Sequence, residues 1–239
     1  MSEFDFAGTF DEDYLYFYEQ FLTPERNAEE VETVAELLAG RTEILDCPCG
    51  HGRISNGLAE RGFRVTGLDA TELFLDRARA DATEFGVDVE YVHGDMRALP
   101  WRERFDGIVN WFTSFGYFDD DENREVLRQF HDALRPGGRL AMEMMNIARV
   151  MLNFRPQHLD ESGDDFMLDK VELDLEQART RTERIIVRAG RVRRTHFAVR
   201  YFSFPELADW LRAAGFENVH TPGLTTETRL VVLADRPPA

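Results

Sequence analysis

The sequence predicts an α/β fold in which a doubly wound, mostly parallel sheet of seven strands is covered by helices. Over residues 1–150, stretches of helical periodicity alternate with short apolar strands, which is typical of a parallel sheet with helices on both faces. A glycine-containing loop follows the first strand and leads into a helix. After residue 150 the periodicity changes, which predicts a small antiparallel β insertion after the fifth strand.

Two helices precede the sheet and the others alternate with its strands. An aromatic helix is expected at about residues 12–22, and a second has Thr23 as N-cap, Pro24 in its first position and Gly40 at its end. The five strands of the core are expected at residues 42–46, 63–68, 87–92, 105–110 and 140–145. The helices between them are expected from the loop 47–52 to residues 58–59, over residues 71–85, and from residues 119–122 to the break at 136–138.

The C-terminal third combines the insertion with the end of the sheet. Antiparallel strands are expected at residues 166–175, 180–187 and 192–202. Ser203 and Glu206 have capping-box spacing for a helix that Gly215 ends, and the last strands are expected at residues 216–220 and 230–234. The predicted parts are cap helices at 1–40, an α/β core at 41–150, the insertion at 151–202, and a last helix with two strands of the core sheet at 203–239.

Composition excludes several classes of partner. The 239 residues carry 45 acidic and 28 basic side chains, so the net charge is −17, and such an acidic protein repels nucleic acid. No run of 18 apolar residues and no cationic, apolar leader is found, so neither a membrane span nor secretion is expected. The only cysteines, Cys47 and Cys49, are too close in sequence to staple distant elements, which favours a reducing cytoplasm.

The loop after the first strand indicates a nucleoside site. Gly50 and Gly52 lie between a strand and a helix, where backbone N–H groups can face a ligand. Asp69 ends the next strand, 19 residues after Gly50, a spacing suited to a carboxylate that accepts hydrogen bonds from two ribose hydroxyls. Ser55 stands where a dinucleotide loop would have its third glycine, which disfavours a pyrophosphate ligand.

Three further motifs follow in order: Gly94-Asp95-Met96, Phe105-Asp106 leading to Asn110, and Pro136-Gly137-Gly138. With these motifs the chain resembles the class I S-adenosylmethionine-dependent methyltransferases over roughly residues 40–150, and more loosely to its C-terminus. The resemblance implies a Rossmann-like methyltransferase fold, with S-adenosyl-L-methionine as cofactor and S-adenosyl-L-homocysteine as product. One departure is Pro48, where the family usually has glycine; proline lacks an N–H, so this position can donate no hydrogen bond to the cofactor.

The resemblance also implies roles for individual residues. The loop from Asp46 to Gly52 would cradle the methionine part, Asp69 the ribose, and the residues after the second and third strands the adenine. Asn110 would line the floor beneath the sulfonium, and Tyr14 would reach over the cofactor. Independently of the resemblance, Arg53 at the helix start could pair with the cofactor carboxylate through its fork of donors. The predicted cofactor-binding residues are Tyr14, Asp46, Gly50, Gly52, Arg53, Asp69, Ala70, Asp95, Met96 and Asn110.

Several of these residues also have purely structural explanations. Arg53 could be a solvated surface arginine. Tyr14, Phe17, Tyr18 and Phe21 fall on one helical stripe, which fits either an aromatic lid or ordinary core packing. No metal is expected, because the run from Cys47 to His51 would have to bend sharply to bind one ion and has no second cysteine pair.

The methyl acceptor is expected to be a small molecule. The segment Thr113 to Tyr117 resembles amine-methylating enzymes of sugar and natural-product pathways, and Trp111-Phe112 differs from the loop of family members that methylate nucleobases or glutamine. Ser114, Tyr117 and Glu143 are candidates for contacting the acceptor, and no catalytic residue is named.

The predicted function is therefore methyl transfer by in-line displacement from S-adenosylmethionine to a small-molecule nitrogen or oxygen. The alternatives are an NAD-dependent oxidoreductase and a non-catalytic S-adenosylmethionine-binding protein. The insertion could wall the acceptor pocket, form a dimer surface, or passively extend the sheet.

Overall fold

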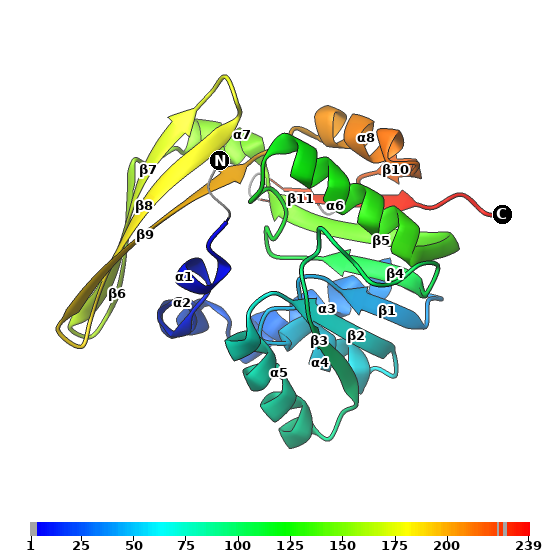
Figure 1. Cartoon of the computed structure of the whole chain (residues 1–239), viewed down its shortest axis with the longest axis horizontal. Helices are drawn as coiled ribbons and strands as arrows, with labels where there is room; N and C mark the ends of the chain where they lie inside the picture. Colours follow the sequence, from blue (N-terminus) through cyan, green and yellow to red (C-terminus); the bar gives the residue numbers. More distant parts are fainter. Residues whose placement is uncertain (1–3, 224, 227–228) are drawn as a thin grey trace.

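The computed structural model, which describes residues 4–223, 225–226 and 229–239, contains the predicted seven-stranded sheet (Figure 1). Its strand order is β10-β11-β5-β4-β1-β2-β3. The strands are β1 (Glu43–Asp46), β2 (Arg64–Asp69), β3 (Val89–His93), β4 (Phe105–Asn110), β5 (Leu134–Met145), β10 (Glu217–His220) and β11 (Arg229–Asp235). Neighbouring strands from β3 to β5 pair in parallel, and β11 pairs antiparallel with both β5 and β10. The predicted fold class is confirmed.

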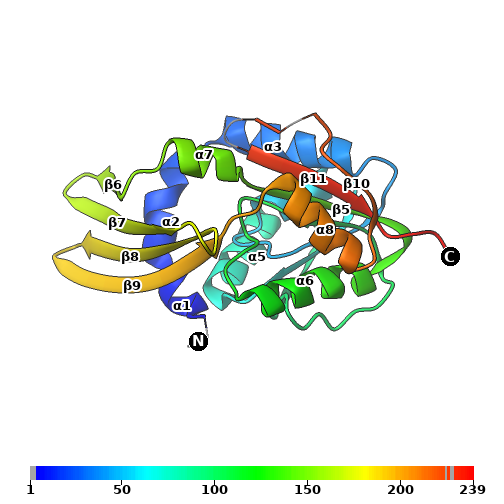
Figure 2. The ribbon, with the colours of Figure 1, turned by 90° about the horizontal axis from the view of Figure 1, so that it is seen from above.

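Helices cover both faces of this sheet, as Figure 2 shows from above. They are α3 (Pro24–Leu37), α4 (Arg53–Glu60), α5 (Glu72–Phe85), α6 (Asp120–Ala133) and α8 (Phe204–Ala213). Successive strand residues point to opposite faces. On β1, Ile44 therefore packs in the core with α3 and α4, whereas Leu45 packs in the core with α6 and α8.

The helices and strands begin and end close to the predicted residues, with two differences. Strands β1 to β4 lie within two residues of the predicted ranges, and Asp119 caps α6 in a capping box with Glu122. The helix expected at 12–22 is divided into α2 (Glu12–Tyr18) and a 3-10 turn, η1 (Glu19–Phe21). Strand β5 begins at Leu134, because Leu134 already pairs with Phe105 before an irregularity in the register.

The insertion forms a second, four-stranded antiparallel sheet. Its strands are β6 (Gln157–Ser162), β7 (Asp165–Asp174), β8 (Arg179–Arg188) and β9 (Arg191–Arg200), in that spatial order. Strand β6 and helix α7 (Ile147–Leu152) were not predicted from the sequence. Both are short. The sequence of β6 shows no alternating apolar pattern, and most of its side chains are exposed.

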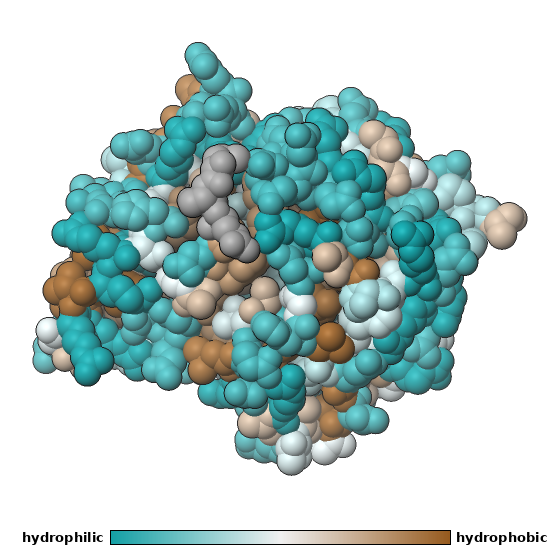
Figure 3. Space-filling view, in the orientation of Figure 1, coloured by the Kyte–Doolittle hydropathy of each residue, from teal (hydrophilic) through white to brown (hydrophobic). Residues whose placement is uncertain are grey.

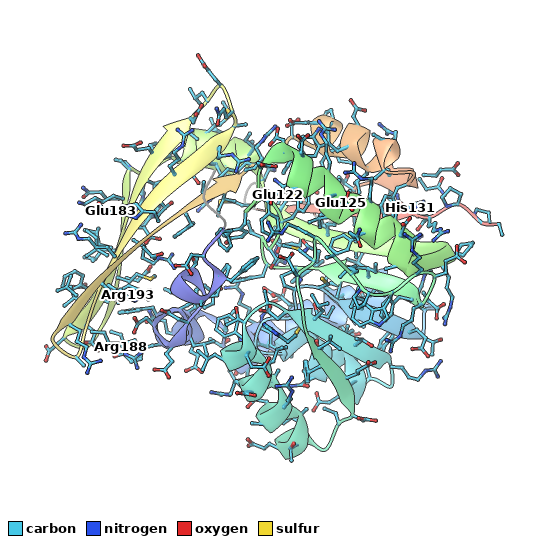
Figure 4. All side chains as sticks on the ribbon, in the orientation of Figure 1. Glu122, Glu125, His131, Glu183, Arg188 and Arg193 are labelled. Atoms are coloured by element: carbon cyan, nitrogen blue, oxygen red, sulfur yellow. The ribbon has the colours of Figure 1, made fainter. Side chains whose placement is uncertain are left out.

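The N-terminal helices α1 (Phe6–Thr9) and α2 lie between the two sheets (Figures 1 and 2). Phe17 on α2 packs against Met167 and Ile186 of the second sheet. Arg193 on β9, labelled in Figure 4, forms ion pairs with Asp11 and Asp13. Apolar packing and ion pairs therefore attach these helices to the insertion.

The surface is predominantly polar. Figure 3 shows hydrophilic residues over most of one face, with apolar residues in separate small patches. Among the described residues, no helix is both long and apolar enough to cross a membrane.

Candidate functional site

A cavity of about 960 Å³ opens where the carboxyl ends of β1, β2 and β4 meet. Parallel strands direct their carboxyl ends to one edge of the sheet, so loops distant in sequence come together there. Seven of the ten predicted cofactor-binding residues line this cavity. They are Tyr14, Asp46, Gly50, Arg53, Asp69, Ala70 and Met96.

Asp46 ends β1 and is 2% exposed. Its Oδ2 accepts a hydrogen bond of 2.6 Å from the hydroxyl of Ser55, in the first turn of α4. Burial raises the pKa of Asp46 to about 7, although the Ser55 hydrogen bond acts in the opposite direction. From the sequence, Ser55 was expected only to disfavour a dinucleotide; its place in the first turn of the helix after the loop is the signal for this contact.

Asp69 fixes the loop between β1 and α4. Its Oδ2 accepts from the backbone N–H of Gly50 at 2.8 Å, and its Oδ1 accepts from the backbone N–H of Thr71 at 2.9 Å. Burial raises the pKa of Asp69 above its ordinary value, although these hydrogen bonds lower it. Gly50 adopts a left-handed conformation, with φ of 55°. The carboxylate faces the cavity and keeps acceptor capacity on both oxygens.

Arg53 begins α4 and is buried rather than solvated. Its Nη1 lies 2.6 Å from the Glu30 carboxylate, and its side chain is only 9% exposed. Its guanidinium also lies over the ring of Phe112, 5.0 Å from the centroid. The interpretation of Arg53 as a surface arginine is therefore wrong.

Aromatic residues from the N-terminus close the cavity. Tyr14 stacks on Tyr18 with ring centroids 4.3 Å apart and also contacts Phe10 and Phe74. Burial raises the pKa of Tyr14, so its phenol is neutral at physiological pH. Phe17 from the same stripe is fully buried in the core with the insertion. Of this stripe, Tyr14 therefore lines the cavity, whereas Phe17 lies in the core.

Three predicted residues do not line the cavity. The Asp95 carboxylate forms an ion pair of 2.6 Å with Arg97 and also accepts from its backbone N–H. A Cβ on Gly52 would lie 2.4 Å from the Tyr91 hydroxyl, so close packing explains this glycine. Asn110 is fully buried and donates to the carbonyl of Cys47 at 2.8 Å.

Other lining residues were missed as site residues. Phe4, Phe6, Phe10 and Leu22 come from the N-terminal segment, and Trp111 and Phe112 from the loop after β4. The concentration of phenylalanine in the first ten residues was the available signal, but sequence alone does not place this segment over the sheet edge.

A second, larger cavity lies between α2, the loop after β4 and the second sheet. Its lining includes Glu143 and side chains from β6, β7, β8 and β9. The insertion therefore forms a wall of this cavity. The two cavities share four aromatic residues, which we call the aromatic wall: Phe10, Tyr14, Phe112 and Tyr117.

The part of the aromatic wall after β4 has an unusual backbone. Phe112 and Thr113 both have positive φ, 62° and 55°, a region that non-glycine residues seldom adopt. The Glu143 carboxylate accepts from the Phe112 N–H at 2.8 Å, and the Glu143 carbonyl accepts from the Thr113 N–H at 3.1 Å. Arg229 lies 3.3 Å from the same carboxylate. Glu143 thus anchors a strained turn.

The predicted acceptor candidates occupy different positions. Ser114 lines the first cavity, and its hydroxyl donates to the carbonyl of Trp111 at 2.7 Å. Tyr117 lines both cavities, and burial raises its pKa. Glu143 lines only the second cavity, and burial raises its pKa although Arg229 lowers it. His131 is on α6 against Phe216, and Figure 4 shows it far from the N-terminal helices.

No three histidine, cysteine, aspartate or glutamate side chains are grouped as a metal site within the described part of the chain. Cys47 and Cys49 are free, buried thiols whose pKa values are raised by burial. A raised pKa keeps a thiol protonated, and metals bind the thiolate.

Comparison with known proteins agrees with this geometry. Residues 44–138 match the family described as a methyltransferase domain. The ubiquinone biosynthesis O-methyltransferase of Pseudomonas entomophila is 29% identical over 190 residues, which cover 79% of this chain and 69% of that protein.

Solved structures with the same fold span nearly the whole chain. The CcbJ methyltransferase of Streptomyces caelestis is 22% identical, with a TM-score of 0.79 over 99% of this chain and 100% of that one. The sugar N-methyltransferase KedS8 of Streptoalloteichus is 19% identical, with a TM-score of 0.73 over 99% of this chain and 97% of that one. The ordered motifs, the sheet topology and the matched domain over residues 44–138 together support an S-adenosylmethionine-dependent methyltransferase with the class I fold, whose cofactor is S-adenosyl-L-methionine.

Proposed function

We propose that this enzyme methylates a nitrogen or oxygen of a small molecule that binds in the second cavity. The observation that carries the proposal is the aromatic wall, because its four side chains line both cavities. A donor in the first cavity and an acceptor in the second would meet beside these shared side chains. Holding two reactants in such proximity supplies a large part of the rate of a displacement.

The first cavity fits the proposed donor. It opens at the carboxyl edge of the parallel sheet, where folds of this class bind their ligands. Asp69 has free acceptor capacity for hydroxyl groups, and Gly50 leaves its side of the loop open, because no atom lies within 4 Å of where its Cβ would be. Trp111 lines the cavity with a buried Nε1 that has no hydrogen-bond partner among the described residues.

We assign parts of the cofactor to these residues. Asp69 would accept from the ribose hydroxyls, Ala70 and Met96 would contact the adenine, and Asp46 with the loop from Gly50 would hold the methionine end. Arg53 has donors beyond the Nη1 that pairs with Glu30, so it can also bind a carboxylate. Gly52, Asp95 and Asn110 stay predictions without support from the cavity lining. For Asp95 in particular, Arg97 already pairs with both carboxylate oxygens.

S-adenosylmethionine supplies an electrophilic methyl group when it is bound. The protein's own part is then to orient the acceptor and exclude water. Tyr14 and Tyr117 line both cavities, and aromatic rings attract a cationic group such as a sulfonium. Neither phenol is a base at neutral pH, because burial raises the pKa of each. Glu143 would act by positioning the Phe112 turn.

The choice of a small acceptor rests on the second cavity and on the relatives. One relative is named as an O-methyltransferase and one structural neighbour as a sugar N-methyltransferase, so nitrogen and oxygen acceptors both remain in the proposal. The net charge of −17 argues against a nucleic acid substrate. We also propose a cytoplasmic location, since both cysteines are free thiols.

Calorimetric titration with S-adenosylhomocysteine, and separately with NADH, tests the donor site. We expect micromolar binding of S-adenosylhomocysteine and none of NADH; binding of NADH alone would contradict the assignment. Turnover of methyl-labelled S-adenosylmethionine on a panel of small amines, hydroxyls and phenols then tests the acceptor class. Binding without turnover of any small acceptor would count against the proposed function.

A further inference from the structure

The charges that line the second cavity are opposite in balance to those of the whole chain. Five arginines and three acidic residues line it, whereas the chain has 28 basic and 45 acidic residues. In a protein of net charge −17, an anion approaches only where local positive charge offsets the overall repulsion. The excess of positive charge in the second cavity therefore affects which molecules can enter it.

Three of the five arginines are already neutralised. Arg184 pairs with Asp169 at 2.7 Å, and Arg26 pairs with Glu30 at 2.9 Å. Arg229 lies 3.0 Å from Glu30 and 3.3 Å from Glu143. The charges of these three arginines are therefore compensated by carboxylates of the same chain, and their side chains form part of the cavity lining.

Arg149 and Arg155 differ from the other three. Neither side chain has a hydrogen bond or an ion pair with any residue in the described ranges, and both residues are exposed. Arg149 lies in the last turn of α7, and Arg155 follows three residues after the helix. The remaining acid, Asp160, belongs to the group around Arg184: burial raises its pKa, Asp169 raises it further, and Arg184 and His158 lower it. The two free guanidinium groups are thus the uncompensated positive charge of the cavity.

We propose that Arg149 and Arg155 bind an anionic group of the methyl acceptor, either a carboxylate or a phosphate. This inference rests on the proposed function, because it takes the second cavity as the acceptor site. Guanidinium groups bind both kinds of oxyanion through two parallel N–H donors. Anchoring at α7 would leave the rest of the acceptor to extend along the cavity toward the aromatic wall. The acceptor is accordingly an anionic molecule with an apolar or aromatic portion.

Two fluorescent probes of matched shape test this inference. The anion 8-anilinonaphthalene-1-sulfonate and the neutral N-phenyl-1-naphthylamine differ by the sulfonate, and both fit an aromatic cavity. The test variant is Arg149→Gln with Arg155→Gln. The control is Arg102→Gln with Arg191→Gln, which removes the same charge from two exposed arginines that line none of the described cavities.

We expect the test variant to bind the sulfonate probe about tenfold more weakly and the neutral probe within about twofold of the parent protein. The control should retain both affinities. Equal loss of both probes, no loss, or the same loss in the control would overturn the inference. Displacement of the sulfonate probe by pyrophosphate assigns a phosphate, displacement by citrate assigns a carboxylate, and displacement by neither overturns the site.

Failure of this inference is distinguishable from failure of the proposed function. Neither variant touches the first cavity, so both should bind S-adenosylhomocysteine like the parent protein. A protein that binds S-adenosylhomocysteine normally but shows no selective loss of the sulfonate probe refutes the anion site alone. A protein that does not bind S-adenosylhomocysteine refutes the proposed function, whatever the probes show.

Discussion

The guanidinium of Arg53 lies 2.6 Å from the carboxylate of Glu30, and both side chains are buried. Glu30 on α3 also pairs with Arg26 and Arg229. Arg53 lines the first cavity, whereas Arg26 and Arg229 line the second. One carboxylate therefore ties together arginines from both cavities. The guanidinium groups of Arg26 and Arg53 also lie over the ring of Phe112, 5.2 and 5.0 Å from its centroid.

Replacing Glu30 by glutamine should destabilise the fold by about 3–5 kcal/mol, because it leaves the buried guanidinium of Arg53 without its counterion. Burial alone would raise the pKa of Glu30, but Arg53 and Arg26 hold it below its ordinary value. Glu30 therefore contributes stability above its unfolded pKa, and that contribution is lost as the pH falls through its lowered folded pKa. Guanidinium chloride unfolding at pH 7 and pH 3 measures both effects.

Glu32→Gln is the matched control on the same helix. Glu32 pairs with Arg61 at 3.1 Å, but its side chain is 60% exposed, so its loss should change the unfolding free energy by less than about 1 kcal/mol. If the two variants were equally stable, Glu30 would not have the central role that its contacts indicate.

Asp46 should make the protein less stable as the pH rises. Its pKa is about 7 in the folded state, against an ordinary value of 3.8. Between these values the unfolded chain releases a proton that the folded protein retains. Stability therefore falls with rising pH by at most about 1.4 kcal/mol per unit, and the loss is complete above pH 7. Asp46→Asn removes this dependence.

Urea unfolding of the parent and of Asp46→Asn between pH 4 and pH 9 measures the difference. All other carboxylates are common to both proteins, so their titration largely cancels. We expect the variant to gain stability relative to the parent up to about pH 7 and to show a constant difference above it. Two parallel curves would mean that Asp46 titrates normally.

The sheet could be predicted because each of its core strands is marked by residues that are adjacent in the sequence. Each strand from β1 to β4 is a short apolar run between helix caps and glycines, and the strand ends that carry Asp46 and Asp69 converge by topology alone. Ordered motifs then identified the family. The hydrogen-bond and ion-pair partners of individual side chains, in contrast, could not be predicted from the sequence. Arg97 follows Asp95 by two residues, yet only the folded loop shows that its guanidinium occupies the carboxylate.

The second cavity depends on contacts between distant segments. Tyr14 and Phe197 both line it, although 183 residues separate them. No helical or strand period indicates that α2 packs between two sheets. The burial of Arg53 could not be predicted for the same reason, because its partner Glu30 lies on a different helix. These features follow from tertiary packing, which overrides what local patterns favour.

Tyr14 should contribute to cofactor affinity through its ring and not its hydroxyl. The ring lines the first cavity and stacks on Tyr18, and its phenol is neutral. Tyr14→Ala should weaken S-adenosylhomocysteine binding about tenfold, since one buried aromatic contact is lost. Tyr14→Phe should stay within about twofold. Calorimetric titration provides the readout for both.

Tyr16→Ala is the control from the same helix. The Tyr16 hydroxyl donates to the carbonyl of Ser162 at 3.3 Å, and its ring packs beside Phe17 on the side of the second sheet. Its removal takes away a similar area without reaching the first cavity, so affinity should not change. Equal losses for Tyr14→Ala and Tyr16→Ala would show that the helix as a whole, and not the Tyr14 ring, supports binding.

Asp69→Ala should weaken S-adenosylhomocysteine binding by about 2–4 kcal/mol, because it removes the carboxylate that we propose accepts from two ribose hydroxyls. The same change frees the backbone N–H groups of Gly50 and Thr71, which now donate to Asp69. Part of the loss would thus come from a looser loop. Asp69→Asn separates the two contributions, since its single carbonyl oxygen can keep one of these backbone contacts while the charge is removed.

The control is Asp76→Ala on α5, where the carboxylate is 71% exposed and, among the described residues, pairs with Arg79 alone. It removes the same group from the neighbouring helix and should leave the affinity unchanged. Thermal unfolding of each variant without ligand shows whether the fold is intact, and calorimetry then gives the affinity. A folded Asp69→Ala protein that bound S-adenosylhomocysteine as tightly as the parent would place the ribose elsewhere, because no other acidic side chain on the β2 side of the cavity could replace it among the described lining residues.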